Sequence, residues 1–216
     1  MKIAILGGSF NPPHICHLFI IHYVLATSQL DQIWCLPCYK HAFGKALLPF
    51  HHRLEMCSLA VESFREDRVK VRPLECDRQG TSWTIDTILY VKELYPEYDF
   101  TWIIGSDVLT ELDRWKDFER LQSLVSFFVV PRAGASQNQN NLNHTLGRHD
   151  HAPASPGIFG ALRELKAQCR LLEEQGVFLP NISSSLIRER VKQHQPIHHL
   201  VPRTVEEYIS THRLYV

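Results

Sequence analysis

The sequence has no apolar run long enough to cross a membrane and no excess of charge of either sign. Its 216 residues include 23 basic and 23 acidic side chains, and no apolar stretch approaches the roughly 18 residues of a spanning helix. Nonspecific nucleic-acid binding would need a basic excess, so we expect neither a nucleic-acid partner nor a membrane. Lys2 leads straight into an apolar segment that Gly and Pro interrupt, so no signal peptide is expected. These absences predict a cytoplasmic protein with one domain over residues 1–216.

Common functional signatures are also missing. The GxGxxG fingerprint of dehydrogenases is not matched at residues 7–12, which read Gly-Gly-Ser-Phe-Asn-Pro. The six cysteines form no regular framework, which favours reduced thiols. One CxxC spacing occurs, from Cys35 to Cys38. These residues end a predicted strand and Pro37 lies between them, so a redox site or a zinc site is the minor interpretation.

Short apolar runs alternate with amphipathic stretches along the chain. Helices are expected around Leu54–Phe64, Ile85–Lys92 and Phe159–Leu172. Alternating strands and helices favour right-handed crossovers, and therefore an α/β fold with one Rossmann-like open parallel sheet and helices on both faces. In such a sheet the ligand cleft lies at the carboxyl ends of the strands. Buried strands are expected at Ile3–Leu6, Ile33–Leu36, Val69–Val71, Trp102–Ile104, Phe127–Val130 and Val177–Leu179.

Residues 133–157 interrupt this alternation. They are rich in Gln, Asn, His, Gly, Ala, Ser and Pro, a composition that predicts a flexible insert in the domain. His144, His149, Asp150 and His151 lie in it, but a polar loop is a simpler interpretation than a metal site.

The segment from Gly7 to His17 is the most informative part of the sequence. Gly7 and Gly8 directly follow an apolar strand and allow a sharp turn that approaches a ligand closely. Pro12 and the proline after it suit the first turn of a helix. His14 and His17 then lie three residues apart on one helical face, where the helix N-terminus adds positive potential. Phosphate contact is favoured over a metal pair, because no third ligand and no HExxH motif accompany them.

Residues 8–17 resemble the signature Gly-Ser-Phe-Asp-Pro-x-His-x-Gly-His of the HxGH nucleotidyltransferases. Asn11 replaces the commoner Asp, and Cys16 replaces the Gly between the histidines. If that glycine serves close approach to the nucleotide, Cys16 narrows the space. A second segment, Ile182–Arg188, resembles the ISSTxIR element of the same family. Alone it would predict an ordinary capped helix with a solvated arginine.

Three further segments narrow the resemblance to bacterial nicotinate mononucleotide adenylyltransferases. They are Thr81–Thr87, Ile104–Asp107 with Trp115 following, and the tail from Leu200 to Tyr215. The resemblance implies that ATP and nicotinate mononucleotide are joined to give deamido-NAD and pyrophosphate. Departures are Ser106, where alanine is usual, and the block at residues 40–45.

The resemblance also implies roles for individual residues. Adenylyl transfer needs orientation and charge neutralisation rather than a protein nucleophile, and Mg²⁺ would accompany ATP with few or no protein ligands. The residues expected to stabilise the α-phosphate and the leaving pyrophosphate are His14, His17 and Arg188. Those expected to bind ATP are Gly7, Gly8, Ser9, Phe10, Gly105, Asp107, Ser183, Ser184 and Ser185. Those expected to bind the mononucleotide are Lys40, Lys45, Trp83, Thr84, Asp86, Trp115 and Arg132.

Alternatives stay open at this stage. The acceptor could be nicotinamide mononucleotide, or phosphopantetheine as in another adenylyltransferase of the HxGH type. A noncatalytic ATP sensor is also compatible with the nucleotide-binding residues. A class I aminoacyl-tRNA synthetase is usually longer and carries a lysine-rich second motif, which this chain does not show. The oligomeric state, with a homodimer among the options, is not determined by the sequence.

Overall fold

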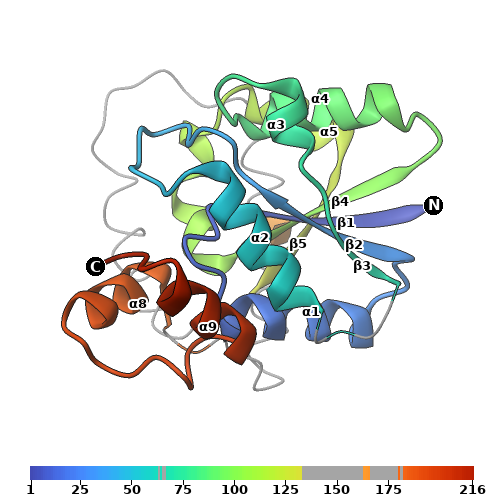
Figure 1. Cartoon of the computed structure of the whole chain (residues 1–216). Coiled ribbons are helices and arrows are strands. Elements are labelled where there is room, and N and C mark those ends of the chain that lie inside the picture. Colours follow the sequence, from blue (N-terminus) through green and yellow to red (C-terminus); the bar gives the residue numbers. More distant parts are fainter. Residues whose placement is uncertain (63, 65–66, 133–162, 166–179, 181) are drawn as a thin grey trace.

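The computed structural model describes residues 1–62, 64, 67–132, 163–165, 180 and 182–216. These residues form a sheet with helices on both of its faces (Figure 1). The insert predicted at residues 133–157 and the strand predicted at residues 177–179 lie outside the described residues. So does the helix predicted at residues 159–172, apart from residues 163–165. Within the described residues, none of the helices combines the length and the apolar character that a membrane span requires.

Five parallel strands form the sheet in the order β3-β2-β1-β4-β5. Each coincides with a run predicted from its apolar residues, and this confirms the predicted fold class. From β1 the chain adds β2 and β3 on one side of the sheet, and then β4 and β5 on the other side of β1. Open α/β sheets bind ligands at the carboxyl ends of the strands beside such a reversal. The strands span Lys2–Gly8 (β1), Gln32–Pro37 (β2), Val69–Val71 (β3), Asp99–Gly105 (β4) and Ser126–Val130 (β5).

Alternate side chains of β1 supply the two main apolar cores. Ile3 and Ile5 pack on one face, and Ala4 and Leu6 on the other, as the two-residue period of a strand requires. The first face is covered by α3 (Leu74–Arg78), α4 (Thr84–Leu94) and α5 (Phe118–Leu124), and the second by α1 (Ile15–Thr27) and α2 (Phe50–Val61).

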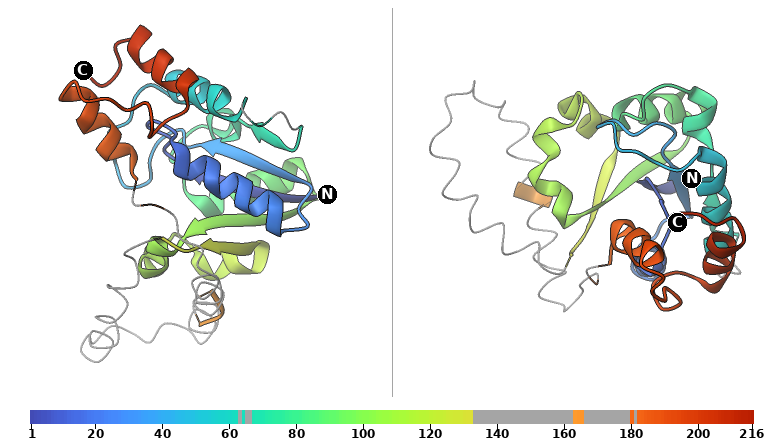
Figure 2. Two further views of the ribbon diagram at one scale, coloured as in Figure 1. Left: turned by 90° about the horizontal axis from the view of Figure 1, so that it is seen from below. Right: turned by 60° about the vertical axis from the view of Figure 1, so that its left-hand side comes forward.

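A third apolar cluster joins the end of the chain to α2. Helices α8 (Ser184–Lys192) and α9 (Arg203–Thr211) pack there, with Met56 of α2 fully buried beneath them. The left view of Figure 2 shows both C-terminal helices beside the first turn of α1. Segments almost 200 residues apart in the sequence are therefore neighbours in space.

One local expectation was wrong, and one buried residue was not expected. Helix α1 begins at Ile15 with His14 as its N-cap residue, so the two prolines precede the helix instead of occupying its first turn. Helix α2 buries Cys57, as its amphipathic pattern predicts, and it also buries Arg53, Met56 and Ala60. Arginine is seldom a core residue, so the sequence pattern did not indicate the burial of Arg53.

Candidate active site

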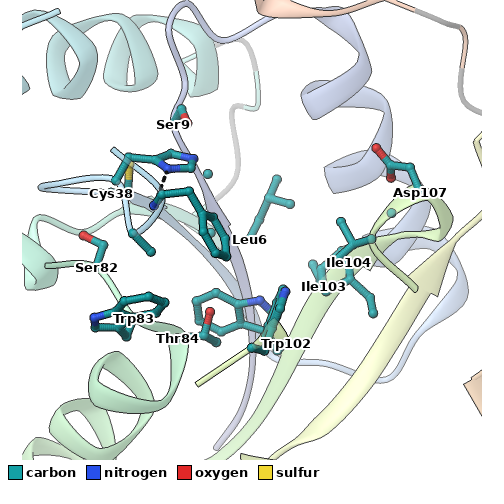
Figure 3. A pocket seen from close by; sticks show the side chains of 18 of the residues that line it. Leu6, Ser9, Cys38, Ser82, Trp83, Thr84, Trp102, Ile103, Ile104 and Asp107 are labelled. Carbon is teal, nitrogen blue, oxygen red and sulfur yellow. Dashed lines mark hydrogen bonds between the residues drawn. The ribbon is translucent and has the colours of Figure 1, made fainter. Parts of the chain in front are cut away.

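A cavity of about 320 Å³ lies at the carboxyl ends of β1 and β4. Figure 3 shows Ser9 at the end of β1, with Trp83 on one side and Asp107 on the other. The cavity brings together predicted site residues from six separate segments of the chain. These residues are Gly7, Gly8, Ser9, His17, Trp83, Thr84, Gly105, Asp107, Trp115 and Arg132.

Two residues of the turn after β1 are constrained, Gly7 by a neighbouring side chain and Phe10 by its backbone conformation. A Cβ atom at Gly7 would lie 2.5 Å from Cζ2 of Trp102, so the tryptophan ring occupies the space that any other residue would need. Phe10 has a positive φ of 44°, a conformation that L-residues rarely adopt. Its side chain is buried, with its ring centroid 4.9 Å from that of His17, and Phe10 itself does not line the cavity. The backbone at Gly7 and Gly8 forms the cavity wall directly.

The two histidines meet at the start of α1. Their ring centroids are 3.8 Å apart, and the backbone N–H of His14 donates to Nδ1 of His17 at 3.1 Å. The pairing depends on His14 being the N-cap, with extended backbone, rather than on two side chains sharing a helical face. Because Nδ1 of His17 accepts this bond, its neutral ring carries the hydrogen on Nε2. His17 therefore brings a hydrogen-bond donor to the cavity that it lines.

The electrostatic setting keeps both rings neutral at physiological pH. Burial, assisted by the charge of Arg132, lowers the pKa of His14 to about 4. Burial also lowers the pKa of His17 well below its usual value, with further contributions from His14 and Arg132. A bound polyphosphate would offset the positive field of Arg132 and favour protonation of the rings.

Helix α8 docks directly on the same turn. Ser184 donates its hydroxyl to the carbonyl of Pro12 at 2.8 Å, and Nη1 of Arg188 donates to the carbonyl of Asn11 at 2.8 Å. Ser183 caps the helix by accepting from the Leu186 N–H. None of these α8 side chains lines the cavity, but Arg188 ends within hydrogen-bond distance of the turn that holds the histidines.

The cysteine between the histidines points away from the cavity. Cys16 is 1% exposed, and its thiol donates to the carbonyl of Pro180 at 3.4 Å. The expectation that it narrows the nucleotide space is therefore wrong: its side chain contacts the segment that leads into α8. Burial raises the pKa of this thiol, as expected for a group without a charged role.

One side of the cavity is built at the end of β4. Nη1 of Arg132 donates to Oδ2 of Asp107 at 2.8 Å, and its backbone N–H donates to the hydroxyl oxygen of Ser106 at 2.9 Å. Ser106 is buried, and this bond explains a hydroxyl at a position where the resembling family has alanine. A Cβ atom at Gly105 would collide with Oδ1 of Asp107, so glycine lets the carboxylate fold back over the strand end.

The other side of the cavity consists of the start of α4, with Trp83 and a buried, hydrogen-bonded glutamate beneath it. Trp83 and Thr84 begin α4, whose N-cap carries no side-chain hydrogen bond. Glu75 lies beneath them, 4% exposed, and accepts from the Thr87 hydroxyl at 2.9 Å and the Tyr39 N–H at 3.2 Å. Burial raises the pKa of Glu75. Sequence reasoning missed this residue, because a single glutamate in a short helix carries no motif.

Three predicted mononucleotide-binding residues do not line the cavity. Lys40 and Lys45 are exposed in the segment between β2 and α2. Asp86, in the first turn of α4, instead pairs with Lys116 at 2.9 Å, and Lys116 does line the cavity. Lys116 is a further residue that no sequence pattern had singled out.

The CxxC residues are buried free thiols. Burial raises the pKa of Cys35 to about 12 and also raises that of Cys38, which disfavours the thiolate that redox chemistry and zinc binding require. In the part of the chain that the structure describes, no group of three His, Cys, Asp or Glu side chains is arranged to hold a metal ion. The four residues 144 and 149–151 considered for metal binding lie outside it.

Comparisons with known proteins agree over most of the chain. A family model described as cytidylyltransferase-like matches residues 5–190. A relative from Anaeromyxobacter dehalogenans, named "Probable nicotinate-nucleotide adenylyltransferase", is 34% identical, with 99% of this chain and 96% of the relative covered. A Bacillus subtilis relative, named "Nicotinate-nucleotide adenylyltransferase", is 32% identical, with coverage of 99% and 98%.

The fold also matches solved structures. That of "Plasmodium falciparum nicotinic acid mononucleotide adenylyltransferase complexed with NaAD" has a TM-score of 0.70 at 22% identity, and the match covers 99% of this chain and 97% of that one. At this identity the match is a likeness of fold. Together with the family match and the curated relatives, it shows that the chain belongs to the cytidylyltransferase-like family, alongside relatives named nicotinate-nucleotide adenylyltransferases.

Proposed function

We propose that this protein transfers the adenylyl group of ATP to nicotinate mononucleotide, giving deamido-NAD and pyrophosphate in NAD biosynthesis. One observation carries the proposal at the level of the site. A single cavity is lined by the turn that follows the central strand β1 and precedes the two histidines. Asp107, just after β4, lies on one side of this turn, and Trp83, at the start of α4, lies on the other. Two nucleotides bound on the two sides would place their phosphates beside the turn. The names of the relatives support the same reaction.

The reaction needs no protein nucleophile. The phosphate of the mononucleotide attacks the α-phosphorus of ATP, the new P–O bond forms, and the bond to pyrophosphate breaks. The protein has to hold the two phosphates in line and stabilise the charge on the oxygens. We assign charge stabilisation to His17 through Nε2–H, with His14 and Arg188 fixing and supporting the turn beside it. Pyrophosphate leaves as the anion, so no general acid is required.

Binding roles follow the two sides of the cavity. Gly105 and Asp107 are proposed to bind the adenosine of ATP. The turn at Gly8 and Ser9 is proposed to bind its triphosphate. On the other side Trp83 would stack on the pyridine ring. The serines of α8 act indirectly, since they dock that helix on the turn.

The first turn of α4 supports the acid over the amide as acceptor. Its N-cap residue Trp83 provides no side-chain hydrogen bond, so backbone N–H groups near Thr84 are available to a ligand. A helix N-terminus favours a carboxylate through its hydrogen-bond donors and its dipole. A carboxamide carries no charge and offers only one acceptor oxygen, and it therefore gains less there.

Mg²⁺ is proposed to enter as part of the substrate, bound to the phosphates of ATP. The Asp107 carboxylate at the cavity is already paired with Arg132, and the described residues offer no three-ligand cluster. This donor set fits an ion held mainly by phosphate oxygens and water.

The test measures pyrophosphate release from ATP and Mg²⁺ with nicotinate mononucleotide, its amide and phosphopantetheine. We expect the largest kcat/KM with nicotinate mononucleotide. Equal or larger values with the amide would overturn the choice of acceptor, and release only with phosphopantetheine would reassign the enzyme. ATP binding without pyrophosphate from any acceptor would indicate a sensor.

A substitution at the turn tests the chemistry. His17→Ala should lower kcat by about two to three orders of magnitude, the usual effect of losing a preorganised transition-state donor. His22→Ala is the matched control, because His22 lies on the exposed surface of the same helix. An unchanged kcat for His17→Ala would remove this residue from the mechanism.

A further inference from the structure

Arg53 is a buried cation that joins three segments around the cavity. It lies on α2 and is 1% exposed. Its Nε donates to the carbonyl of Leu48 at 3.0 Å, its Nη1 to the carbonyl of Ser9 at 2.9 Å, and its Nη2 to the carbonyl of Tyr39 at 3.3 Å. Among the described residues, no carboxylate lies within ion-pair distance of it. Its hydrogen-bond partners are therefore neutral oxygens, together with the Cys38 sulfur 3.9 Å from Nη1.

The three carbonyls belong to the segments that the proposed reaction must align. Ser9 lies in the turn assigned to the triphosphate. Tyr39 and Leu48 stand at the two ends of a segment that lines the cavity through His41, Ala42 and Phe43. One planar guanidinium therefore fixes both ends of this segment relative to the ATP turn.

A structural role alone explains this arrangement poorly. Burying an unpaired guanidinium is unfavourable, and a well-packed apolar side chain in its place is often as stable or more stable. The same helix shows this alternative one turn later, where Met56 fills a buried position with apolar contacts. The arginine contributes what an apolar side chain cannot, namely fixed distances between three backbone oxygens.

We propose that Arg53 is a positioning residue of adenylyl transfer, setting the distance between the ATP turn and the cavity-lining segment between Tyr39 and Leu48. This inference rests on the proposed function. In-line attack depends on reacting atoms within about 3–3.5 Å, and a misplacement of about 1 Å can lower the rate about 100-fold. The residue acts through the backbone of Ser9, Tyr39 and Leu48 and needs no contact with either substrate.

The first test is Arg53→Lys, which keeps the charge but cannot reach three carbonyls with one planar group. We expect kcat to fall about 100-fold, while the Kd values for MgATP alone and for the mononucleotide alone change less than about threefold. Each substrate can bind to its own segment of the cavity when the other segment is displaced. The reaction, in contrast, requires the two segments to hold their phosphates at the correct distance from each other. An unchanged kcat would overturn the proposal, and so would a kcat loss explained by weakened binding of one substrate.

The matched control is Met56→Ala, a buried truncation three residues further along α2 that faces the C-terminal cluster. It should lower the free energy of unfolding by about 2–5 kcal/mol and leave kcat of the folded enzyme unchanged. If it lowers kcat as much as Arg53→Lys does, the effect belongs to helix stability and the proposal is wrong.

A second variant covers the case in which Arg53→Lys does not fold. Arg53→Gln removes the buried charge and keeps a single donor nitrogen in place of three, and it should show the same fall in kcat. If both variants are unfolded under conditions where Met56→Ala is folded, Arg53 serves the fold and the proposal fails. All rates are compared with the wild type and its best acceptor. An inactive wild type would therefore refute the proposed function and not the role of Arg53.

Discussion

His14 makes the stability of this protein depend on pH in a calculable way. Its imidazole is 2% exposed, and its pKa is lowered to about 4 from an ordinary value near 6.5. Because the folded pKa is the lower one, the unfolded chain binds the proton more readily. The stability due to a neutral His14 is complete above about pH 6.5 and is lost as pH falls toward 4.

The magnitude follows from the difference of about 2.5 pKa units. At about 1.4 kcal/mol per unit the full loss is about 3.5 kcal/mol, of which about 2.5 kcal/mol is reached by about pH 4.5. Asp and Glu side chains also titrate in this range, so the wild type alone cannot isolate the histidine. His14→Asn removes the titration and leaves the carboxylates in place.

The assay is urea unfolding of both proteins at about pH 7 and about pH 4.5. The free energy of unfolding should fall further in the wild type than in His14→Asn, by about 2.5 kcal/mol. His17, whose pKa is lowered partly by His14, should add to the difference. Parallel losses in the two proteins would show that His14 is not neutral and buried as described, and would refute the reasoning.

Two further predictions concern the same turn. Gly7→Ala should lower the free energy of unfolding by about 1–3 kcal/mol, measured by urea unfolding, because the added Cβ meets the Trp102 ring at 2.5 Å; a neutral effect would mean that the ring moves freely. Tyr215→Phe should lower kcat/KM for ATP about tenfold by removing a 2.9 Å bond to Asn11. Tyr208→Phe loses a comparable bond to a histidine on α2 and should leave kcat/KM unchanged, so equal effects would contradict the second prediction.

The strands were predictable because their signal is local. Runs such as Ile3–Leu6 are continuously apolar, as strands buried on both faces must be. Five of the six predicted runs pair in the sheet near their predicted positions, and the sixth, at residues 177–179, lies outside the described residues. The two histidines were recognised in the same way, from neighbours within one short segment. Their geometry was not, because an N-cap residue is defined by its backbone angles and not by its residue type.

The remaining features depend on contacts between distant parts of the chain. Cys16 contacts Pro180, and Ser106 accepts from Arg132; neither partner is indicated by residue type or spacing. Arg53 did leave a signal, since it occupies the same helical face as Met56, but a charged residue on an apolar stripe is usually assigned to the solvent side. Its buried position follows from three carbonyl partners that only the folded chain supplies.

The docking of α8 has a consequence for partly folded forms of the protein. The turn with the histidines receives hydrogen bonds from Ser184 and Arg188, whereas the sheet is complete without them. Detachment of the last two helices would leave most secondary structure in place and yet abolish turnover. Enzyme activity would therefore decline before circular dichroism does during gradual denaturation, and the gap between the two curves would measure how firmly the C-terminal helices are held.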